Sequence, residues 1–255
     1  MIFAVANQKG GVGKTTTAIN LSATIAQAGE SVLLVDLDPQ SNSTTGLGFS
    51  IREPRPTVFE LLLGEKGLFD ILIPTAVGGL RLAPASPDMA GATVVLPRLE
   101  RREYRLRMGL EPVRAAGKTP FSYVFIDCPP SLDLLTVNAL VAADAVIVPV
   151  QAEYYALEGL TQLLATVDAV RKRLNPGLTM AGLVLTMADL RTNLAREVEQ
   201  EVRRHFPTLT YRTVVPRNVR LAEAPSFGVP VSILDPHCVG SDAYFDLAKE
   251  VIAHG

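Results

Sequence analysis

The stretch QKGGVGKTT at residues 8–16 decides the fold, because it joins a short apolar run to a segment of helical periodicity. Residues 2–6 are expected to form a strand, and residues 15–28 a helix that ends at Gly29. A glycine-rich turn between a strand and a helix lets consecutive backbone N–H groups curl around phosphate oxygens. The N-terminus of the helix contributes further N–H donors and the positive end of its dipole. The stretch therefore predicts a phosphate-binding loop.

The side chains of this loop favour a nucleoside triphosphate together with a magnesium ion. Lys14 can reach the β- and γ-phosphates as a point charge, and the Thr15 hydroxyl is placed to ligate Mg²⁺. The residues predicted to bind ATP through this loop are Lys9, Gly10, Gly11, Val12, Gly13, Lys14, Thr15 and Thr16. We therefore predict ATP and Mg²⁺ as the cofactors of this chain.

The rest of the chain alternates short β-branched apolar runs with helical segments, which is typical of α/β proteins. Further strands are predicted at residues 31–36, 121–127, 145–150, 182–187 and 211–215. Further helices are predicted at residues 157–174, 193–205 and 242–253, with a peripheral helix at residues 96–113. Because the strands are apolar on both faces, we expect a mostly parallel twisted sheet with helices on both faces. The expected fold class is α/β of the P-loop NTPase type, in a single domain over residues 1–255.

Composition excludes several other classes of protein. The 255 residues are 48% hydrophobic and carry a formal net charge of −2, so the chain can bury a large core but lacks the strong positive charge of a dedicated nucleic-acid-binding domain. Two cysteines are too few for a disulfide framework and fit a reducing cytoplasm. The apolar stretch at residues 139–150 is shorter than the roughly 20 residues that span a membrane. We expect a cytoplasmic protein in which any DNA contact comes from a local patch.

Three carboxylates are expected beside the loop, because ligands bind at the carboxyl ends of parallel strands. The strand at residues 31–36 ends with Asp36 and leads to Asp38, so both side chains share a parity and point the same way. The strand at residues 121–127 delivers Asp127 to the same edge. A carboxylate at this place can orient the attacking water or contact the water shell of the metal. We predict Asp127 as a metal ligand through water, with Asp36 as a second candidate of the same kind.

The loop departs from the general pattern G-x-x-x-x-G-K-[ST], because residue 8 is Gln rather than Gly. Its form K-G-G-x-G-K-[ST], with a second lysine at Lys9, resembles the deviant Walker A motif of the ParA/MinD ATPase superfamily. The resemblance implies that Lys9 crosses a dimer interface to reach the ATP of the partner. It also implies that Asp38 is the catalytic carboxylate, with Lys9 and Lys14 as the other catalytic residues.

Longer stretches resemble the chromosomal ParA, or Soj, family of partition proteins. These stretches lie at residues 35–40, 126–132, 149–160 and 215–226. The resemblance implies an ATP-dependent sandwich homodimer that binds double-stranded DNA without sequence preference and so associates with the nucleoid. It further implies slow hydrolysis that a ParB-type partner stimulates. In related proteins the Pro-Arg-Asn segment forms part of the adenine pocket, which assigns Pro216 and Asn218 to the base.

Arginines would carry the DNA contact that the resemblance implies. The family match assigns this role to Arg191 and Arg220, with Arg217 as a further candidate. Between residues 189 and 223, seven arginines stand against five acids, so this segment can neutralise phosphates despite the acidic total. Around residues 226–239 the chain lacks basic residues that relatives often carry, which weakens the expected DNA-binding surface. A second run is expected to form an ordinary exposed helical face instead: Arg98, Arg101, Arg102, Arg105 and Arg107.

Two other functions compete with this interpretation. A MinD-like regulator of division-site placement would end in a basic amphipathic helix that docks on lipid, and residues 247–255 do not match that pattern. An electron-transfer ATPase like nitrogenase iron protein would bind an iron–sulfur cluster through cysteines. Neither Cys128 nor Cys238 lies in the matching segments, and Cys128 is expected to be a buried packing residue. The sequence therefore favours partition without membrane binding, and leaves chromosome and plasmid cargo both open.

Overall fold

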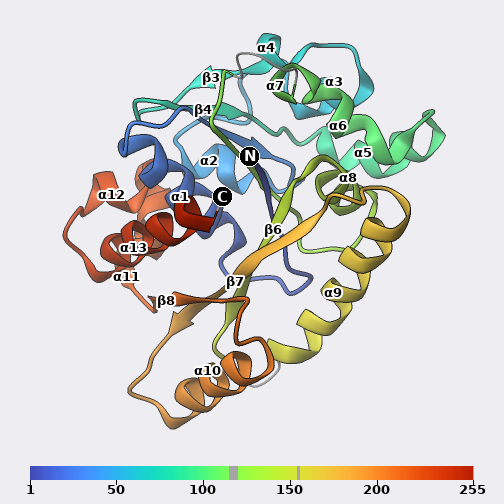
Figure 1. Ribbon diagram of the computed structural model, residues 1–255. Coiled ribbons are helices and arrows are strands. Elements are labelled where there is room, and N and C mark those ends of the chain that lie inside the picture. The colour runs from blue at the N-terminus through green and yellow to red at the C-terminus, as the bar shows by residue number, and fades with distance from the viewer. Residues whose placement is uncertain (115–119, 154–155, 255) are drawn as a thin grey trace.

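The computed structural model describes residues 1–114, 120–153 and 156–254, and all the strands in these ranges belong to one sheet (Figure 1). The strand order is β3-β4-β2-β5-β1-β6-β7-β8, and every pairing is parallel except that of β3 with β4. The strands are β1 (Ile2–Val5), β2 (Val32–Asp36), β3 (Ile73–Pro74), β4 (Leu80–Ala83), β5 (Tyr123–Asp127), β6 (Ala145–Gln151), β7 (Thr179–Ala188) and β8 (Thr210–Pro216). The predicted α/β fold with a mostly parallel sheet is confirmed.

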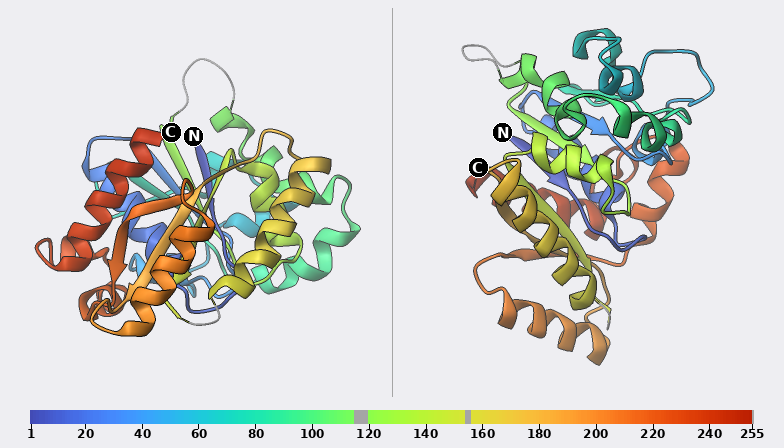
Figure 2. Two further views of the ribbon diagram at one scale, coloured as in Figure 1. Left: turned by 60° about the horizontal axis from the view of Figure 1, so that its bottom comes forward. Right: turned by 90° about the vertical axis from the view of Figure 1, so that its right-hand side faces the viewer.

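Helices cover both faces of the sheet, as Figures 1 and 2 show. They are α1 (Lys14–Gln27), α2 (Asn42–Gly46), α3 (Val58–Leu63), α4 (Leu68–Ile71), α5 (Met89–Val95), α6 (Arg105–Gly109), α7 (Glu111–Arg114), α8 (Leu134–Ala142), α9 (Ala156–Arg173), α10 (Asn193–His205), α11 (Val219–Glu223), α12 (Val231–Leu234) and α13 (Val239–His254). Helices α1, α11, α12 and α13 share a core with Phe3 and Phe125, whereas α3, α5, α6, α8 and α9 share one with Ala4 and Ile126. Among the helices described, none is long and apolar enough to cross a membrane.

The structure corrects the sequence analysis in the segment before β5. The helix predicted at residues 96–113 is wrong, because this segment forms the 3₁₀ helices η1 (Leu96–Arg98) and η2 (Arg102–Tyr104), followed by α6 and α7. Pro97 lies in η1, and Arg101 takes a left-handed backbone conformation (φ 52°) that interrupts a continuous helix. Strands β3 and β4 were not predicted, because β3 has only two residues and the exposed Arg81 interrupts the apolar run of β4.

The other predicted elements are found with shifted ends. The six predicted strands correspond to β1, β2, β5, β6, β7 and β8, and the four long predicted helices to α1, α9, α10 and α13. Helix α8 was not predicted, because it is buried nearly all round and so shows no polar face. The stretch at residues 149–160, which carries part of the family resemblance, includes residues 154 and 155. These two residues lie outside the described ranges.

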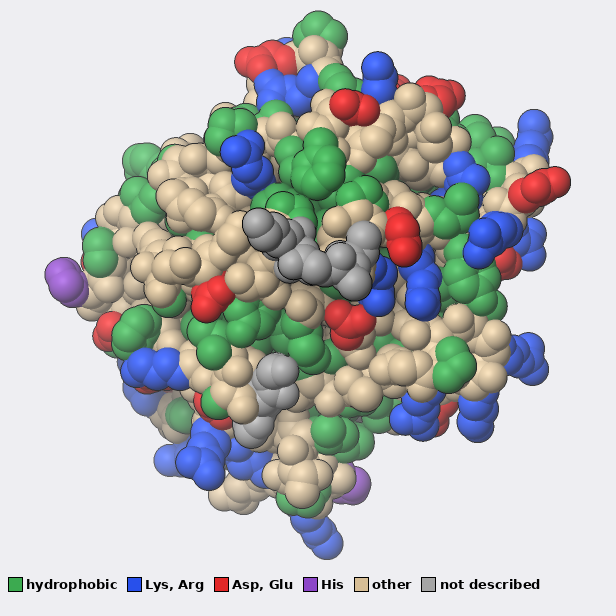
Figure 3. Space-filling model, turned by 45° about the horizontal axis from the view of Figure 1, so that its top comes forward, with side chains coloured by type: hydrophobic (Ala, Val, Ile, Leu, Met, Phe, Trp, Pro, Cys, Tyr) green, Lys and Arg blue, Asp and Glu red, His purple; other side chains and the backbone are tan. Residues whose placement is uncertain are grey.

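Part of the arginine run near α6 supports neighbouring helices instead of forming a uniform exposed face. Arg105 donates to the last two carbonyl oxygens of α3, at 2.7 Å each, and Arg107 donates to a carbonyl oxygen near the end of α8 at 3.4 Å. Basic side chains at helix C-termini satisfy free carbonyl groups and the negative end of the dipole. The exposed members of the run are Arg98, Arg101 and Arg102. Over this side of the molecule, on the right of Figure 3, basic and acidic side chains are intermixed.

The register of the central strands brings the predicted site residues to one edge of the sheet. Asp36 pairs with Asp127 at the ends of β2 and β5, and Val5 pairs with Asp127 across β1 and β5. The chain leaves β1 directly after Val5 and enters the glycine-rich loop, so this loop begins beside both carboxylates. The carboxyl ends of the central strands therefore form the floor of the candidate site.

Candidate nucleotide-binding site

The loop between β1 and α1 has the backbone that a phosphate cradle requires. Gly11 and Gly13 adopt left-handed conformations (φ 73° and 85°), which L side chains rarely tolerate. A Cβ atom on Gly11 would have no neighbour within 4 Å, so there is free space next to the loop. Thr186 Oγ1 donates to Val12 O at 2.8 Å and fixes the loop to β7. The predicted residues 9–16 thus run as one loop into the first turn of α1.

Lys14 is folded back over this loop. The residue is buried, with 6% of its surface exposed, and its Nζ donates to the carbonyl oxygen of Lys9 at 3.0 Å. Burial lowers the pKa of Lys14, while the nearby carboxylates of Asp127 and Asp38 act in the opposite direction. A buried ammonium group is costly to desolvate unless an anion compensates for its charge. Lys14 is therefore placed to bind a phosphate at this loop.

Asp36 and Asp127 form a buried carboxylate pair behind the loop, each with 0% exposure. Asp36 Oδ2 accepts hydrogen bonds from Thr44 N at 2.8 Å and from Thr44 Oγ1 at 2.7 Å. Asp127 Oδ2 accepts one from Ser43 Oγ at 2.8 Å. Burial raises the pKa of Asp36 to about 8, with a further contribution from the charge of Asp127, and burial raises the pKa of Asp127 to about 6. The pair therefore requires a cation or protons nearby.

A magnesium ion fits beside Asp127. Asp127 Oδ1 is buried and has no hydrogen-bond partner among the described residues, although a buried carboxylate oxygen normally has one. The Thr15 hydroxyl lies close enough to this carboxylate to lower its pKa, so two oxygen ligands of the kind that Mg²⁺ prefers are adjacent. Asp36 is less available, because it already accepts from Thr44 and from the backbone N–H of Asp38 at 3.2 Å. The geometry favours Thr15 and Asp127 as metal ligands, with Asp36 in support.

Asp38 lies in the turn after β2, next to the phosphate loop. It is 5% exposed, and its Oδ1 accepts a hydrogen bond from Gln40 N at 2.9 Å. Burial raises the pKa of Asp38, while the hydrogen bond from Gln40 and the charge of Lys14 lower it. A carboxylate beside the lysine that faces the phosphates is well placed to orient an attacking water.

Lys9 points away from this site. Its Nζ forms an ion pair with Glu153 Oε2 at 3.1 Å, and 35% of its side chain is exposed. Glu153 Oε1 in turn accepts a hydrogen bond from Gln151 Nε2 at 2.6 Å. Glu153 lies in the 149–160 stretch, but no sequence pattern gave it a role. The two lysines of this loop therefore point in different directions. Lys14 points into the loop, and Lys9 points to the surface.

A cavity of about 450 Å³ adjoins the loop and brings the two predicted base-binding residues together. Pro216 and Asn218 line it together with Gly13 and Thr16. Asn218 Oδ1 also caps the first turn of α11 at 3.2 Å. Met187 lines the same cavity with a left-handed backbone (φ 51°), and no sequence pattern singled it out. A nucleotide with its phosphates at the loop can thus place its base against Pro216.

The three candidate DNA-binding arginines follow β7 and β8 at the same edge of the sheet. Arg191 exposes 91% of its side chain and forms a bidentate ion pair with Asp189, with both N–O distances 2.7 Å. Arg220 contacts Asp235 at 3.2 Å and a glutamate of α11 at 3.0 Å. Arg217 lines a groove together with Arg191. Any phosphate that binds Arg191 or Arg220 must therefore compete with neighbouring carboxylates.

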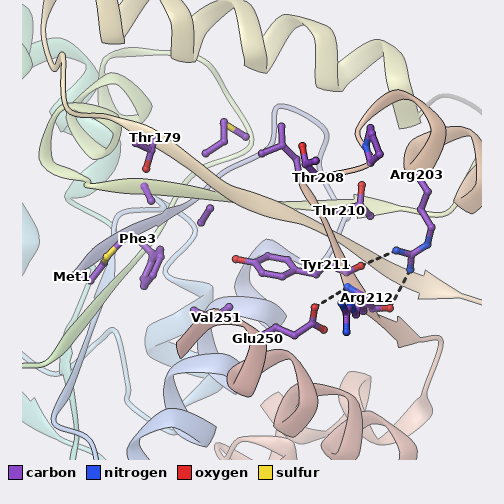
Figure 4. A pocket seen from close by; sticks show the side chains of 15 residues that line it. Met1, Phe3, Thr179, Arg203, Thr208, Thr210, Tyr211, Arg212, Glu250 and Val251 are labelled. Atoms are coloured by element: carbon purple, nitrogen blue, oxygen red, sulfur yellow. Dashed lines mark hydrogen bonds between the residues drawn. The ribbon is translucent and has the colours of Figure 1, made fainter. Parts of the chain in front are cut away.

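A second cavity, of about 510 Å³, lies at the opposite edge of the sheet (Figure 4). Arg203 donates to the carbonyl oxygens of Tyr211 and Arg212 at 3.1 and 3.0 Å. Glu250 accepts hydrogen bonds from Arg212 N and Thr213 N, both at 2.8 Å. These bonds fasten β8 to α10 and α13, so the charged groups that line this cavity stabilise the fold.

The buried carboxylate pair predicts that the nucleotide-free protein loses stability as the pH rises. The pKa of Asp36 is about 8 in the folded chain, whereas an unfolded aspartate has a pKa of about 3.9. Between these values the folded state binds more protons than the unfolded state, so the free energy of unfolding falls with rising pH. We expect the free energy of unfolding, measured by urea denaturation, to be at least about 1 kcal/mol lower at pH 8 than at pH 5. Asp36→Asn should flatten this difference; an equal difference in both proteins would contradict the account.

Comparisons with known proteins agree with this geometry. A family profile described as "AAA domain" matches residues 1–180. The chain is 54% identical over 252 residues to chromosome partitioning protein ParA of Caulobacter vibrioides, covering 99% of this chain and 94% of that protein. It is 51% identical over 254 residues to sporulation initiation inhibitor protein Soj of Bacillus subtilis, covering 100% of this chain and 99% of that protein. A solved structure of cobyrinic acid a,c-diamide synthase from Mycobacterium smegmatis, with bound ADP and magnesium, matches with a TM-score of 0.86. The two chains are 37% identical, and the match covers 99% of this chain and 94% of that one.

The similarity to the partition proteins extends over the whole length of the chain. It is therefore not confined to the phosphate loop, which many nucleotide-binding proteins share. The four stretches that carried the resemblance lie within these full-length matches. The chain belongs to the ParA/Soj family of chromosome-partitioning proteins.

Proposed function

We propose that the chain is an ATP-dependent dimerising switch for DNA segregation. Binding of Mg-ATP joins two copies face to face, and the dimer binds double-stranded DNA of the nucleoid without sequence preference. Slow hydrolysis, stimulated by a ParB-type partner, separates the copies again. The names of the full-length relatives and the ADP and magnesium in a similar solved structure support this proposal.

The different directions of the two loop lysines carry the proposal. Lys14 is buried over its own loop, where it can serve the β- and γ-phosphates of the nucleotide bound in cis. Lys9 reaches the surface, where it is held by a partly exposed ion pair with Glu153. Such pairs contribute only about 0–1 kcal/mol, so a phosphate on a second copy can displace Glu153. A surface lysine that can exchange Glu153 for a phosphate is what a dimer-dependent site needs.

Hydrolysis then rests on four residues of this chain. Lys14 holds the terminal phosphates, and Asp38 beside it orients the attacking water and accepts its proton. Because burial raises the pKa of Asp38, its carboxylate is a better proton acceptor than a surface aspartate. Thr15 and Asp127 would hold Mg²⁺, which neutralises charge on the phosphates when bound.

Lys9→Ala should weaken ATP-dependent dimerisation while leaving ATP bound. Removal of a charge-assisted contact costs about 1.5–3 kcal/mol, so the dimer dissociation constant should rise at least about tenfold. Sedimentation velocity with a non-hydrolysable ATP analogue measures the dimer, and equilibrium titration measures the nucleotide. Lys172→Ala, which removes an exposed lysine of α9, is the matched control and should dimerise normally. A Lys9→Ala protein that dimerises like the wild type would refute the role given to this lysine.

The choice between DNA and lipid as the target is tested on the wild-type protein. An electrophoretic shift of unrelated duplex DNA should require ATP and should weaken steeply as salt increases. A MinD-like membrane-associated division-site ATPase, the alternative function, would instead co-sediment with anionic vesicles in an ATP-dependent manner. Vesicle binding without any DNA shift would overturn the proposal.

A further inference from the structure

Two segments far apart in the chain touch through a pair of glycines. Gly48 follows α2, and Gly228 follows the 3₁₀ helix η3 (Ala224–Phe227); both have left-handed backbones (φ 86° and 69°). A Cβ atom on Gly228 would lie 2.6 Å from Gly48 Cα, and one on Gly48 would lie 3.1 Å from Gly228 O. The contact is therefore backbone against backbone. At both positions glycine supplies the conformation and the missing side chain at once.

One side of this contact is connected to the catalytic turn. Ser41 N donates to Asp38 O at 2.8 Å. Thr45 N donates to Ser41 O at 3.0 Å, and Gly48 N donates to Thr45 O at 2.9 Å. The intervening α2 also supplies the hydroxyl groups that bind the two buried carboxylates. Gly48 thus ends a short hydrogen-bonded segment that starts at Asp38 and would move with it.

This segment is under local strain. Ser41 is not a glycine, yet it has a left-handed backbone (φ 55°), and its Oγ is buried without a hydrogen-bond partner among the described residues. Strained backbone and an unsatisfied hydroxyl persist only where the surroundings impose them, and they are concentrated at sites that switch. The segment from Asp38 to Gly48 therefore has the features of a switch element beside the terminal-phosphate site.

The other side of the contact carries a candidate DNA-binding residue. Arg220 lies in α11, which continues directly into η3 and ends at Gly228. The packing is not limited to the glycine pair, because a Cβ atom on Gly46 would lie 3.7 Å from Pro225 Cβ in η3. A displacement of α2 would therefore push on η3 and, through it, on the short helix that carries Arg220.

We propose that the contact between Gly48 and Gly228 couples the terminal-phosphate site to Arg220, so that both glycines are positioning residues for nucleotide-dependent DNA binding. The inference rests on the function proposed above. The base cavity also adjoins α11 through Asn218, but ATP and ADP have the same base. The segment from Asp38 to Gly48, by contrast, starts beside Lys14, where the third phosphate would lie under the proposed function. Within one copy, the glycine pair thus gives Arg220 a direct packing link to the site that differs between ATP and ADP.

The decisive variant is Gly228→Ala, with Gly29→Ala as its matched control. Gly29 also has a left-handed backbone (φ 101°), but a Cβ atom there would have no neighbour within 4 Å, so the control adds the same kind of backbone strain without touching the contact. The measurement is the ratio of the duplex-DNA dissociation constants with ADP and with a non-hydrolysable ATP analogue. We expect Gly228→Ala to lower this ratio at least about tenfold, and Gly29→Ala to leave it unchanged.

A purely structural role predicts a different result. If the glycines served only packing, Gly228→Ala would lower the melting temperature but keep the wild-type ratio and the wild-type KM for ATP. A folded Gly228→Ala protein with that ratio would overturn the inference. By thermodynamic reciprocity, the effect of DNA on ATP affinity must also shrink in the variant if the coupling is lost.

Hydrogen exchange on the wild-type protein keeps the inference testable even if the variant does not fold. Replacing ADP by the ATP analogue should change amide protection in residues 41–48 and 219–228 together. A change confined to residues 41–48 would reject the coupling. If the wild type bound DNA equally well with either nucleotide, the proposed function would fail, and the exchange result would still decide whether the two segments respond together.

Discussion

Asp38→Ala should hydrolyse ATP at least about 100-fold more slowly than the wild type, while it still binds ATP and dimerises. The substitution removes the carboxylate that lies beside Lys14, and it leaves the phosphate loop and the hydroxyl of Thr15 unchanged. Without that carboxylate, no group orients the attacking water and no base accepts its proton. Single-turnover assays measure the chemical step, and size-exclusion chromatography with ATP measures the dimer.

Asp38→Asn separates this catalytic role from a structural one. Asp38 Oδ1 accepts a hydrogen bond from Gln40 N, and an amide oxygen can accept the same bond. If Asp38 only shaped the turn after β2, Asp38→Asn would turn over normally. We expect it to be as slow as Asp38→Ala, because an amide is a poor proton acceptor. Fast hydrolysis in either variant would remove Asp38 from the mechanism.

Arg220→Glu should weaken ATP-dependent DNA binding at least about 100-fold without preventing the dimer. The change replaces a guanidinium by a carboxylate next to Glu223 and Asp235, so a repulsive acidic cluster would face the phosphates. Two copies of the change act in each dimer. Fluorescence anisotropy with labelled duplex DNA at several salt concentrations gives both the affinity and the salt slope, which should become shallower.

The matched control for this experiment is Arg173→Glu at the end of α9. Arg173 is exposed and forms no ion pair with a described residue. Its reversal changes the net charge of the chain by the same amount, so it reports on general electrostatics alone. We expect the control to lower DNA affinity much less than Arg220→Glu. Equal losses would show that net charge, and not the place of Arg220, controls binding.

Much of the site was predictable because parallel strands deliver their carboxyl ends to one edge. The glycine loop predicted the place of Lys14 and Thr15, and the shared edge of the parallel strands predicted that Asp36 and Asp127 lie together, as their pairing shows. These inferences needed only local patterns and the geometry of a parallel sheet. The same reasoning gave the two-faced sheet, since the strands were apolar at both parities.

The partners of these groups could not be predicted in the same way. Ser43 and Thr44 lie in the short polar helix α2, where hydroxyl side chains follow one another and no hydrophobic period marks the ones that turn inward. Glu153 meets Lys9 only because β1 and β6 are neighbours, which is a long-range property of the sheet. Helix α8 has no polar face, so its sequence shows no helical period. Arg101 interrupts the predicted helix with a left-handed backbone conformation, which arginine rarely adopts and which the sequence therefore does not indicate.

Both outer strands of the sheet are unsuited to pairing with another chain. At one end, β3 has two residues, and one of them is Pro74, which has no N–H to donate. At the other end, Glu250 occupies the N–H groups of Arg212 and Thr213 in β8. Strand addition, which would join copies irreversibly and without regard to nucleotide, is therefore blocked at both edges. The proposed dimer, which forms at the loop-bearing rim and separates when a phosphate is lost, therefore meets no competition from strand pairing at these edges.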